Sequence, residues 1–183
     1  MAENNCRIIG LAGLHGTGKS HLASLFVDLF KWDHLHKRTW LRNLYDECFA
    51  TQNTTTSWDA WVYQLYDHLG PYRVVEMILS SHKSTSGVVV LDSIHNPEEW
   101  NAVTAVNPNA ILVGVFAPLS TRITRRSPEA IQLDSRRVNY WHQGPNKEFT
   151  CLLTKIEWAF TGHCSRELQI AECESFSQYL HQG

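Results

Sequence analysis

The strongest structural signal in the chain is one continuous run near its start, Gly13-Leu14-His15-Gly16-Thr17-Gly18-Lys19-Ser20. It fits the pattern G-x-x-x-x-G-K-[ST]. Glycines let the backbone turn tightly and aim successive N–H groups at a phosphate. A helix that begins near Gly18 would add its positive end, and Lys19 would neutralise phosphate charge. The run therefore predicts a phosphate-binding loop.

The segments on either side of this loop support the interpretation. Arg7 to Ala12 is a short apolar run that reads as a buried strand. After Gly18 the apolar residues recur at helical spacing as far as about Lys31. Strand, loop and helix in this order are the context that the pattern requires. We therefore expect ATP with Mg²⁺ as the ligand, Ser20 as a metal ligand, and nucleotide contacts from Gly13, His15, Gly16, Thr17, Gly18, Lys19, Ser20 and His21.

Further along the chain, strands and helices alternate. Buried strands are predicted at 88–92 and 110–116, and a last strand at 168–171. Helices are predicted near 40–49, from a Ser57 cap to 69, on to about 81, and at 97–106, 118–126, 149–160 and 176–180. This alternation predicts an α/β fold in which helices cover both faces of a mostly parallel sheet. Ligands of such sheets bind outside the carboxyl ends of the strands.

Three candidate catalytic side chains besides Lys19 follow predicted strands. Asp92 closes the run 88–91, where a carboxylate could hold the magnesium ion or its water, or accept a proton. A helix cap or a turn is the alternative for Asp92. Arg122 and Arg126 follow the third strand and, with Arg125, could stabilise transferring charge. Their alternative is a solvated helix face.

The gross composition favours one soluble domain over residues 1–183. The net charge of −2 shows no overall basic character, so nucleic acid is possible as a partner but is not favoured. Five cysteines without paired spacing favour free thiols, and no signal or membrane segment is evident, so we expect a cytoplasmic protein. No Cys-x-x-Cys motif supports a zinc site. The oligomeric state is left open.

Four stretches together resemble dephospho-coenzyme A kinases and, further off, nucleoside monophosphate kinases. They are RIIGLAGLHGTGKS (7–20), LGPYRVVEMILSS (69–81), VVVLDSIHNPEEW (88–100) and VGVFAPLSTRITRR (113–126). The resemblance implies a P-loop NTPase three-layer fold with a helical acceptor-side insert at about 33–83 and a lid at about 127–143. It also implies transfer of the γ-phosphoryl group of ATP to a small nucleotide-like acceptor.

The residues expected to bind the phosphoryl acceptor depart from that resemblance. His95 stands where the similar kinases place a phosphate-gripping arginine, whereas Arg42 matches their pattern without its preceding acid. We expect Asp33, Arg42 and His95 to contact the acceptor, with Asp33 as a second choice of base after Asp92. Trp40, Trp58 and Trp61 lie in the same region and could stack on a flat ligand, although core packing is favoured for the last two.

Three functions follow from these residues. The first is an ATP-dependent kinase for a small nucleotide-like acceptor, such as a nucleotide, a deoxynucleotide or dephospho-coenzyme A. The second is a kinase for a hydroxyl of a modified nucleotide within DNA, which the altered acceptor residues motivate. The third is a nucleotide-binding regulatory protein without turnover, which His95 in place of an arginine motivates.

Overall fold

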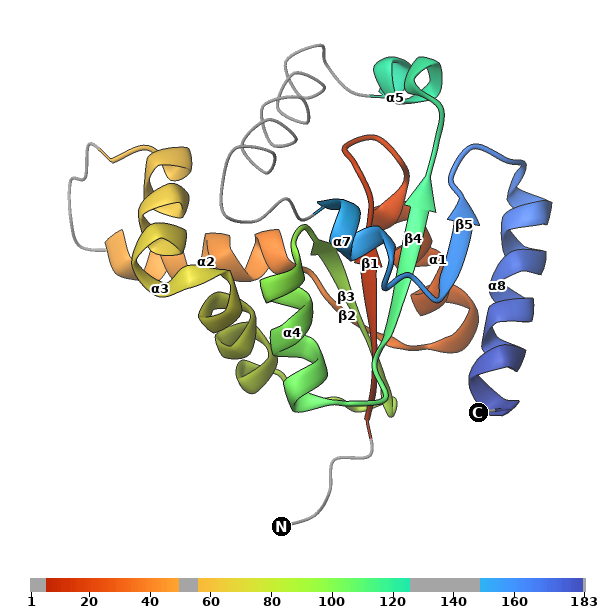
Figure 1. Ribbon diagram of the computed structural model, residues 1–183, viewed down its shortest axis with the longest axis horizontal. Helices are drawn as coiled ribbons and strands as arrows, with labels where there is room; N and C mark the ends of the chain where they lie inside the picture. The colour runs from red at the N-terminus through yellow and green to blue at the C-terminus, as the bar shows by residue number, and fades with distance from the viewer. Residues whose placement is uncertain (1–5, 50–55, 126–148, 183) are drawn as a thin grey trace.

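The centre of the molecule is a sheet of five strands that are all parallel (Figure 1). The computed structural model describes residues 6–49, 56–125 and 149–182. The strands lie in the order β2-β3-β1-β4-β5. Their bounds are Arg7–Ala12 (β1), Asp33–Leu35 (β2), Val88–Ile94 (β3), Ile111–Phe116 (β4) and Trp158–Thr161 (β5). β1 is central, with β3 on one side and β4 on the other.

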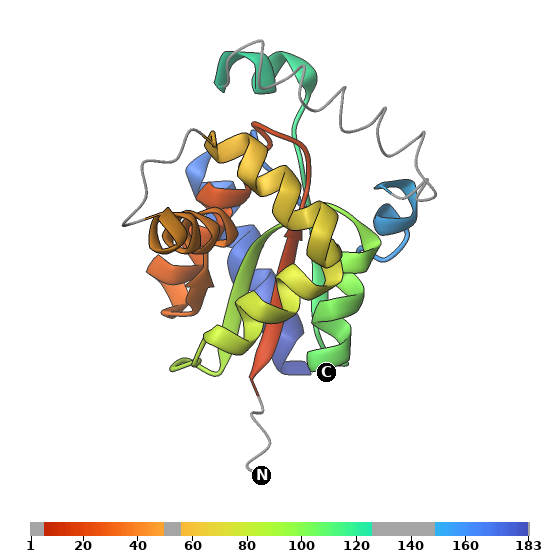
Figure 2. The ribbon, with the colours of Figure 1, turned by 90° about the vertical axis from the view of Figure 1, so that its left-hand side faces the viewer.

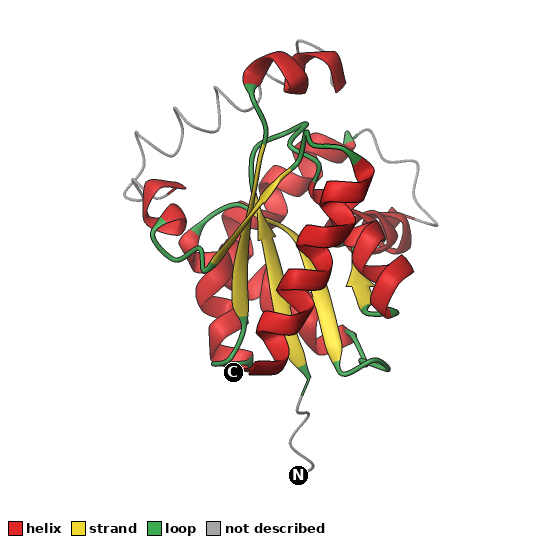
Figure 3. Ribbon diagram, turned by 90° about the vertical axis from the view of Figure 1, so that its right-hand side faces the viewer, coloured by secondary structure: helices red, strands yellow, loops and turns green. Residues whose placement is uncertain are grey.

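Helices cover both faces of this sheet (Figures 2 and 3). Their bounds are Lys19–Phe30 (α1), Lys37–Phe49 (α2), Trp58–Ser81 (α3), Pro97–Val106 (α4), Leu119–Arg125 (α5), Phe149–Leu153 (α7) and Arg166–Gln182 (α8). One buried apolar cluster joins the sheet to α3 and α4, and a second joins it to α1 and α8. The predicted three-layer α/β fold is therefore confirmed in the described residues.

Strands and helices near the phosphate loop follow the predicted pattern. β1 has the predicted bounds, and β3 and β4 match the two other apolar runs, with β3 two residues longer than expected. The helix from Ser57 also forms, and the Ser57 hydroxyl accepts a hydrogen bond from the Ala60 N–H as a cap. Gly70, at φ 77°, joins two helical segments in α3 at a kink. These elements show clear periodicity, which is why the sequence alone predicts them.

The two edge strands were predicted wrongly. β2 was not predicted, and the helix predicted at 149–160 ends at Leu153, with β5 covering the last residues of that range. Both strands are short, and the apolar spacing around β5 also fits a helix, so periodicity alone cannot separate the two. The strand predicted at 168–171 is instead part of α8. Its buried side chains, Gln169, Cys173, Phe176 and Leu180, recur at helical spacing.

The predicted acceptor-side insert at 33–83 begins with β2 and continues with α2 and α3. α2 and the first half of α3 lie to the left of the sheet in Figure 1 and extend away from it. The predicted lid at 127–143 lies outside the described residues. None of the helices that the structure describes is both long enough and apolar enough to cross a membrane.

Candidate functional site

The phosphate loop runs from the carboxyl end of β1 to the first turn of α1, as predicted. Gly18 precedes α1 as its N-cap residue in a left-handed conformation. Gly13 has φ 151°, and a Cβ atom there would lie 2.4 Å from the carbonyl oxygen of Val115 on β4. A side chain at position 13 would therefore collide with backbone. The close approach of loop and strand explains why this position needs glycine.

Lys19 turns back into the loop. Its ammonium group donates hydrogen bonds to the carbonyls of Gly13 at 2.7 Å and of Leu14 at 3.0 Å, and its side chain is 9% exposed. The hydroxyl of Thr17 donates to the same Leu14 carbonyl at 2.9 Å. The cation is thus positioned by the loop backbone inside the turn that would surround a phosphate.

The other predicted nucleotide contacts lie at the rim of the loop. Ser20 and His21 are exposed at the start of α1. The His21 Nε2 lies 3.1 Å from the side-chain oxygen of Gln169 on α8. The carbonyl of His15 accepts a hydrogen bond from Nε of Arg122 at 2.7 Å. The structure therefore gathers all eight predicted loop residues at one edge of the sheet, with His21 directed toward α8.

Two arginines of helix α5 donate hydrogen bonds to carbonyls of the phosphate loop. Besides its bond to His15, Arg122 is 7% exposed, so its side chain is buried against the loop. Arg125 donates from Nη1 to the carbonyl of Gly162 at 2.6 Å and lies 3.5 Å from that of Gly16. Both guanidinium groups therefore shape the loop in this structure. Arg126, the other predicted catalytic arginine, lies outside the described residues.

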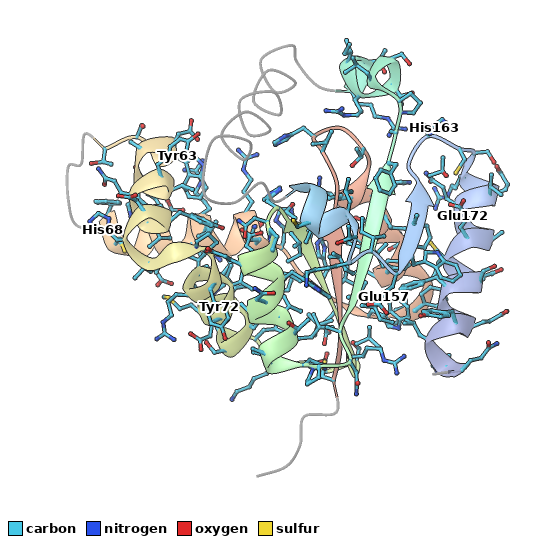
Figure 4. All side chains as sticks on the ribbon, in the orientation of Figure 1. Tyr63, His68, Tyr72, Glu157, His163 and Glu172 are labelled. Atoms are coloured by element: carbon cyan, nitrogen blue, oxygen red, sulfur yellow. The ribbon has the colours of Figure 1, made fainter. Side chains whose placement is uncertain are left out.

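The loop that follows β5 was not predicted from the sequence. A Cβ atom on Gly162 would lie 1.7 Å from the carbonyl oxygen of Thr17, so the two backbones are in direct contact. The Gly162 N–H donates to the Phe116 carbonyl at 2.8 Å, which ties this loop to β4. His163, the next residue, projects near the phosphate-loop edge of the sheet (Figure 4). Because β5 was not predicted, the contact of this loop with the phosphate loop could not be predicted either.

Asp92 lies near the carboxyl end of β3, as predicted, and is 1% exposed. Its Oδ1 accepts a hydrogen bond from the Lys37 N–H at 3.1 Å, so it caps the start of α2. Its Oδ2 lies 3.5 Å from Nε2 of both His34 and His36, and no aligned hydrogen bond reaches it from the described residues. The capping alternative is therefore realised at one oxygen, and the second oxygen lies buried beside the two imidazoles.

The surroundings of Asp92 favour its charged form. Burial raises the pKa of Asp92, but the imidazoles of His34 and His36 and the Lys37 amide lower it by more, so the pKa lies below its ordinary value. The Thr39 N–H donates to Nδ1 of His36 at 3.3 Å, which assigns the proton of the neutral ring to Nε2, facing Asp92. Within the described residues, no three His, Cys, Asp or Glu side chains are arranged to hold a metal ion by themselves.

A second polar group lies on the α3 and α4 side of the same edge. The ammonium group of Lys37 and Oε1 of Glu99 form an ion pair at 2.8 Å, and their side chains are 6% and 1% exposed. The Tyr66 hydroxyl donates to the same Oε1 at 3.3 Å, and the His95 N–H donates to Oε2 at 2.7 Å. Lys37 and Glu99, like His34 and His36, were missed. Only the alternation Asp33-His34-Leu35-His36 could have indicated that the two histidines share one face of a strand.

Asp33 lies elsewhere. It begins β2 opposite Val89, near the start of β3, so it belongs to the amino edge of the sheet. Its carboxylate accepts hydrogen bonds from the hydroxyls of Ser84 and Thr85 and from the N–H groups of Thr85 and Ser86, at 2.7 to 3.2 Å. These contacts anchor the loop before β3. The structure therefore does not bring Asp33 to the site, where its acceptor-binding role was expected.

Arg42 and the tryptophans form an aromatic group on the insert. The exposed guanidinium of Arg42 lies 4.4 Å from the ring centre of Trp58 and 5.9 Å from that of Tyr45. Trp58 and Trp61 are 5.8 Å apart, and Trp61 is buried in the core cluster, as core packing predicts. Trp40 donates its indole N–H to the Ser81 hydroxyl at 2.8 Å. Arg42 thus stacks on aromatic rings of α2 and α3.

No family model and no curated protein matches this sequence. Solved structures do match in fold. A shikimate kinase from Acinetobacter baumannii in complex with shikimate has a TM-score of 0.60 at 11% identity, over 99% of this chain and 96% of that one. Shikimate kinase from Aquifex aeolicus has a TM-score of 0.56 at 16% identity, over 96% and 99%.

A third match is shikimate kinase from Bacteroides thetaiotaomicron, with a TM-score of 0.55 at 14% identity, over 96% of this chain and 98% of that one. At such identities the similarity concerns the fold alone. The more specific likeness to dephospho-coenzyme A kinases stays a prediction. The chain has the P-loop NTPase fold in the form found in shikimate kinases.

Proposed function

We propose that this protein is an ATP-dependent kinase that transfers the γ-phosphoryl group to a small-molecule acceptor. The observation that carries the proposal is the phosphate loop, in which Lys19 is positioned by backbone carbonyls at the end of the central strand. The fold shared with shikimate kinases supports it. That likeness also widens the acceptor class, because shikimate, present in one of those structures, is not a nucleotide.

On the donor side, the loop would surround the phosphates of ATP. Its N–H groups and the start of α1 would face the phosphate oxygens, and Lys19 would move its hydrogen bonds from carbonyls to phosphate. Arg122 would hold the loop in shape through the His15 carbonyl. Phosphoryl transfer gains most from such positioning and charge stabilisation, because its transition state demands little covalent chemistry from the protein.

The residues present fit a magnesium ion. Mg²⁺ takes oxygen ligands, and the exposed Ser20 hydroxyl and the Oδ2 of Asp92 are oxygens of that kind. We propose that these two residues hold the ion directly or through water. When bound with ATP, the ion would supply positive charge that neutralises the phosphates.

On the acceptor side, we propose that the acceptor lies over the carboxyl ends of β2 and β3, near Asp92 and His95. The lowered pKa of Asp92 keeps it ionised at neutral pH, so it would accept a hydrogen bond from an acceptor hydroxyl and orient it. A histidine makes one directed hydrogen bond and is only partly charged near neutral pH. His95 therefore suits a hydroxyl or a base edge better than a phosphate. A nucleotide-like acceptor stays the more specific proposal.

The test is a screen for acceptor-stimulated ADP release. Nucleosides, nucleotides, dephospho-coenzyme A, oligonucleotides and shikimate would each be added to the protein with ATP and Mg²⁺. We expect one class to raise ADP release clearly above the rate without acceptor. Stimulation by oligonucleotides alone, falling steeply with salt, would support the modified-DNA alternative. Saturable ATP binding with no stimulated turnover would support the regulatory alternative.

A further inference from the structure

The buried pair of Lys37 and Glu99 is costly to maintain. Both side chains are almost completely removed from solvent, and their contact is a direct 2.8 Å ion pair. Taking two charges out of water costs several kcal/mol per ion. A protein in which apolar residues of similar volume replace such a pair is often equally stable or more stable. Stability of the fold alone therefore gives a weak reason for this pair.

The position of the pair offers a better reason. Lys37 is the first residue of α2, directly after β2, and its N–H binds Asp92. Glu99 lies in the first turn of α4, after β3, and its N–H is capped by the side chain of Asn96 at 2.9 Å. The pair thus joins the two chain segments that leave the carboxyl ends of β2 and β3, at the edge where the acceptor is proposed to bind.

The carboxylate of Glu99 also connects two further segments. One oxygen accepts the His95 N–H, and the other accepts the Tyr66 hydroxyl from α3. Four segments therefore meet at one buried carboxylate: the loop at His95 that follows β3, and the helices α2, α3 and α4. Ser93, between Asp92 and His95, has φ 66°, a conformation that residues other than glycine rarely adopt. Such a backbone persists only where its surroundings hold it, and Glu99 accepts a hydrogen bond from the His95 N–H two residues further on.

We infer that Glu99 is a positioning residue for the acceptor: with Lys37, it holds the loop of His95 and the start of α2 at a fixed separation. The inference rests on the proposed kinase function and deepens it. Glu99 is buried and acts through the backbone of His95 and the head group of Lys37. A shift of about 1 Å in such supports is enough to weaken a catalytic arrangement.

The test uses an apolar replacement of the whole pair, the variant K37M/E99L. It removes both charges together, so no unpaired charge is left in the interior. We expect both K37M/E99L and the single variant E99L to lose stability, because the His95 N–H and the Tyr66 hydroxyl lose their acceptor. E99L should lose clearly more, because it also leaves the Lys37 charge without its partner. With the best acceptor of the screen, we expect the acceptor KM to rise about tenfold. The ATP KM should stay within about twofold, because Lys37 and Glu99 support the acceptor side of the site and not the phosphate loop.

A second readout does not need an acceptor. The His95 amide should exchange its hydrogen at least about tenfold faster in K37M/E99L, whereas the Val90 amide in the middle of β3 should not change. The matched control is K155M/E157L, which removes one lysine and one glutamate from exposed positions before β5, where Figure 4 shows Glu157 away from the phosphate loop. This control should leave every readout unchanged.

Two outcomes would overturn the inference. One is a folded K37M/E99L protein with an unchanged acceptor KM, and the other is unchanged protection of the His95 amide. If the unchanged protein shows no acceptor-stimulated turnover, the kinase proposal fails by itself, and hydrogen exchange alone then decides whether Glu99 positions the loop. A Lys37→Arg variant keeps the charge and should retain most of the acceptor affinity.

Discussion

The two halves of the candidate site are built in different ways. The proposed donor half is one continuous loop, in which backbone groups and Lys19 would bind the phosphates. The proposed acceptor half is assembled from groups of β2, β3, α2, α3 and α4, which meet around Asp92 and Glu99. A loop of consecutive residues leaves a pattern in the sequence, whereas contacts between separate elements do not. The same difference predicts how each half responds to substitution.

The largest effect is expected at the donor half. Lys19→Ala should lower kcat by about 10²–10³-fold, because removal of one group that stabilises transition-state charge costs this much. The fold should persist, since the lysine head group donates its hydrogen bonds to carbonyls of its own loop, Gly13 and Leu14. Single-turnover ADP release measures the effect, and the exposed Lys31→Ala is a matched control. Near-normal turnover in folded Lys19→Ala would remove the loop from the mechanism.

A smaller and more selective effect is expected at the acceptor half. His95→Ala should raise the acceptor KM about tenfold, the value of one hydrogen bond of about 1.4 kcal/mol, and should leave ATP affinity unchanged. The His95 backbone bond to Glu99 does not depend on the side chain, so the loop should stay in place. Steady-state kinetics with each substrate varied in turn measures the change. Equal losses of ATP and acceptor affinity would place His95 on the donor side.

The smallest effect on activity is expected for Asp33, on the opposite edge of the sheet. Asp33→Asn should leave both KM values unchanged but lower stability at neutral pH by about 1–3 kcal/mol, because a charged acceptor of several hydrogen bonds is lost. Urea unfolding measures this effect. A marked rise in the acceptor KM would instead return Asp33 to the acceptor site.

Asp33 also predicts a pH dependence. Burial raises the pKa of Asp33, but hydrogen bonds from Thr85, Ser84 and Ser86 outweigh it and hold the pKa well below its ordinary value. A group with a depressed pKa contributes stability above its unfolded pKa, about 4, and loses it as the pH falls toward the folded value. The stability difference between the unchanged protein and Asp33→Asn should therefore be constant above about pH 5 and shrink below about pH 4. A constant difference down to pH 2 would contradict this assignment.

Predictions from the sequence succeeded where the signal was local and long. The strands β1, β3 and β4 are apolar runs between turns, and α1 and α4 have helical spacing and clear starts. They failed at β2 and β5, which are three and four residues long and lie at the edges of the sheet. An edge strand of that length is specified by pairing with its neighbour, Val89 to Leu91 for β2, and not by its own pattern.

The amino-acid sequence by itself determined the fold class and the position of the phosphate loop. Those properties depend on nearest neighbours along the chain: glycines that permit the turn, a lysine beside them, and apolar residues at regular spacing. Only the tertiary structure decided that Asp33 lies at the far edge, that Asp92 faces two histidines, and that Glu99 joins four elements. Such contacts connect residues up to 62 positions apart, as in the pair of Lys37 and Glu99. They exist only after the sheet and its helices have packed, because burial is what selects their partners.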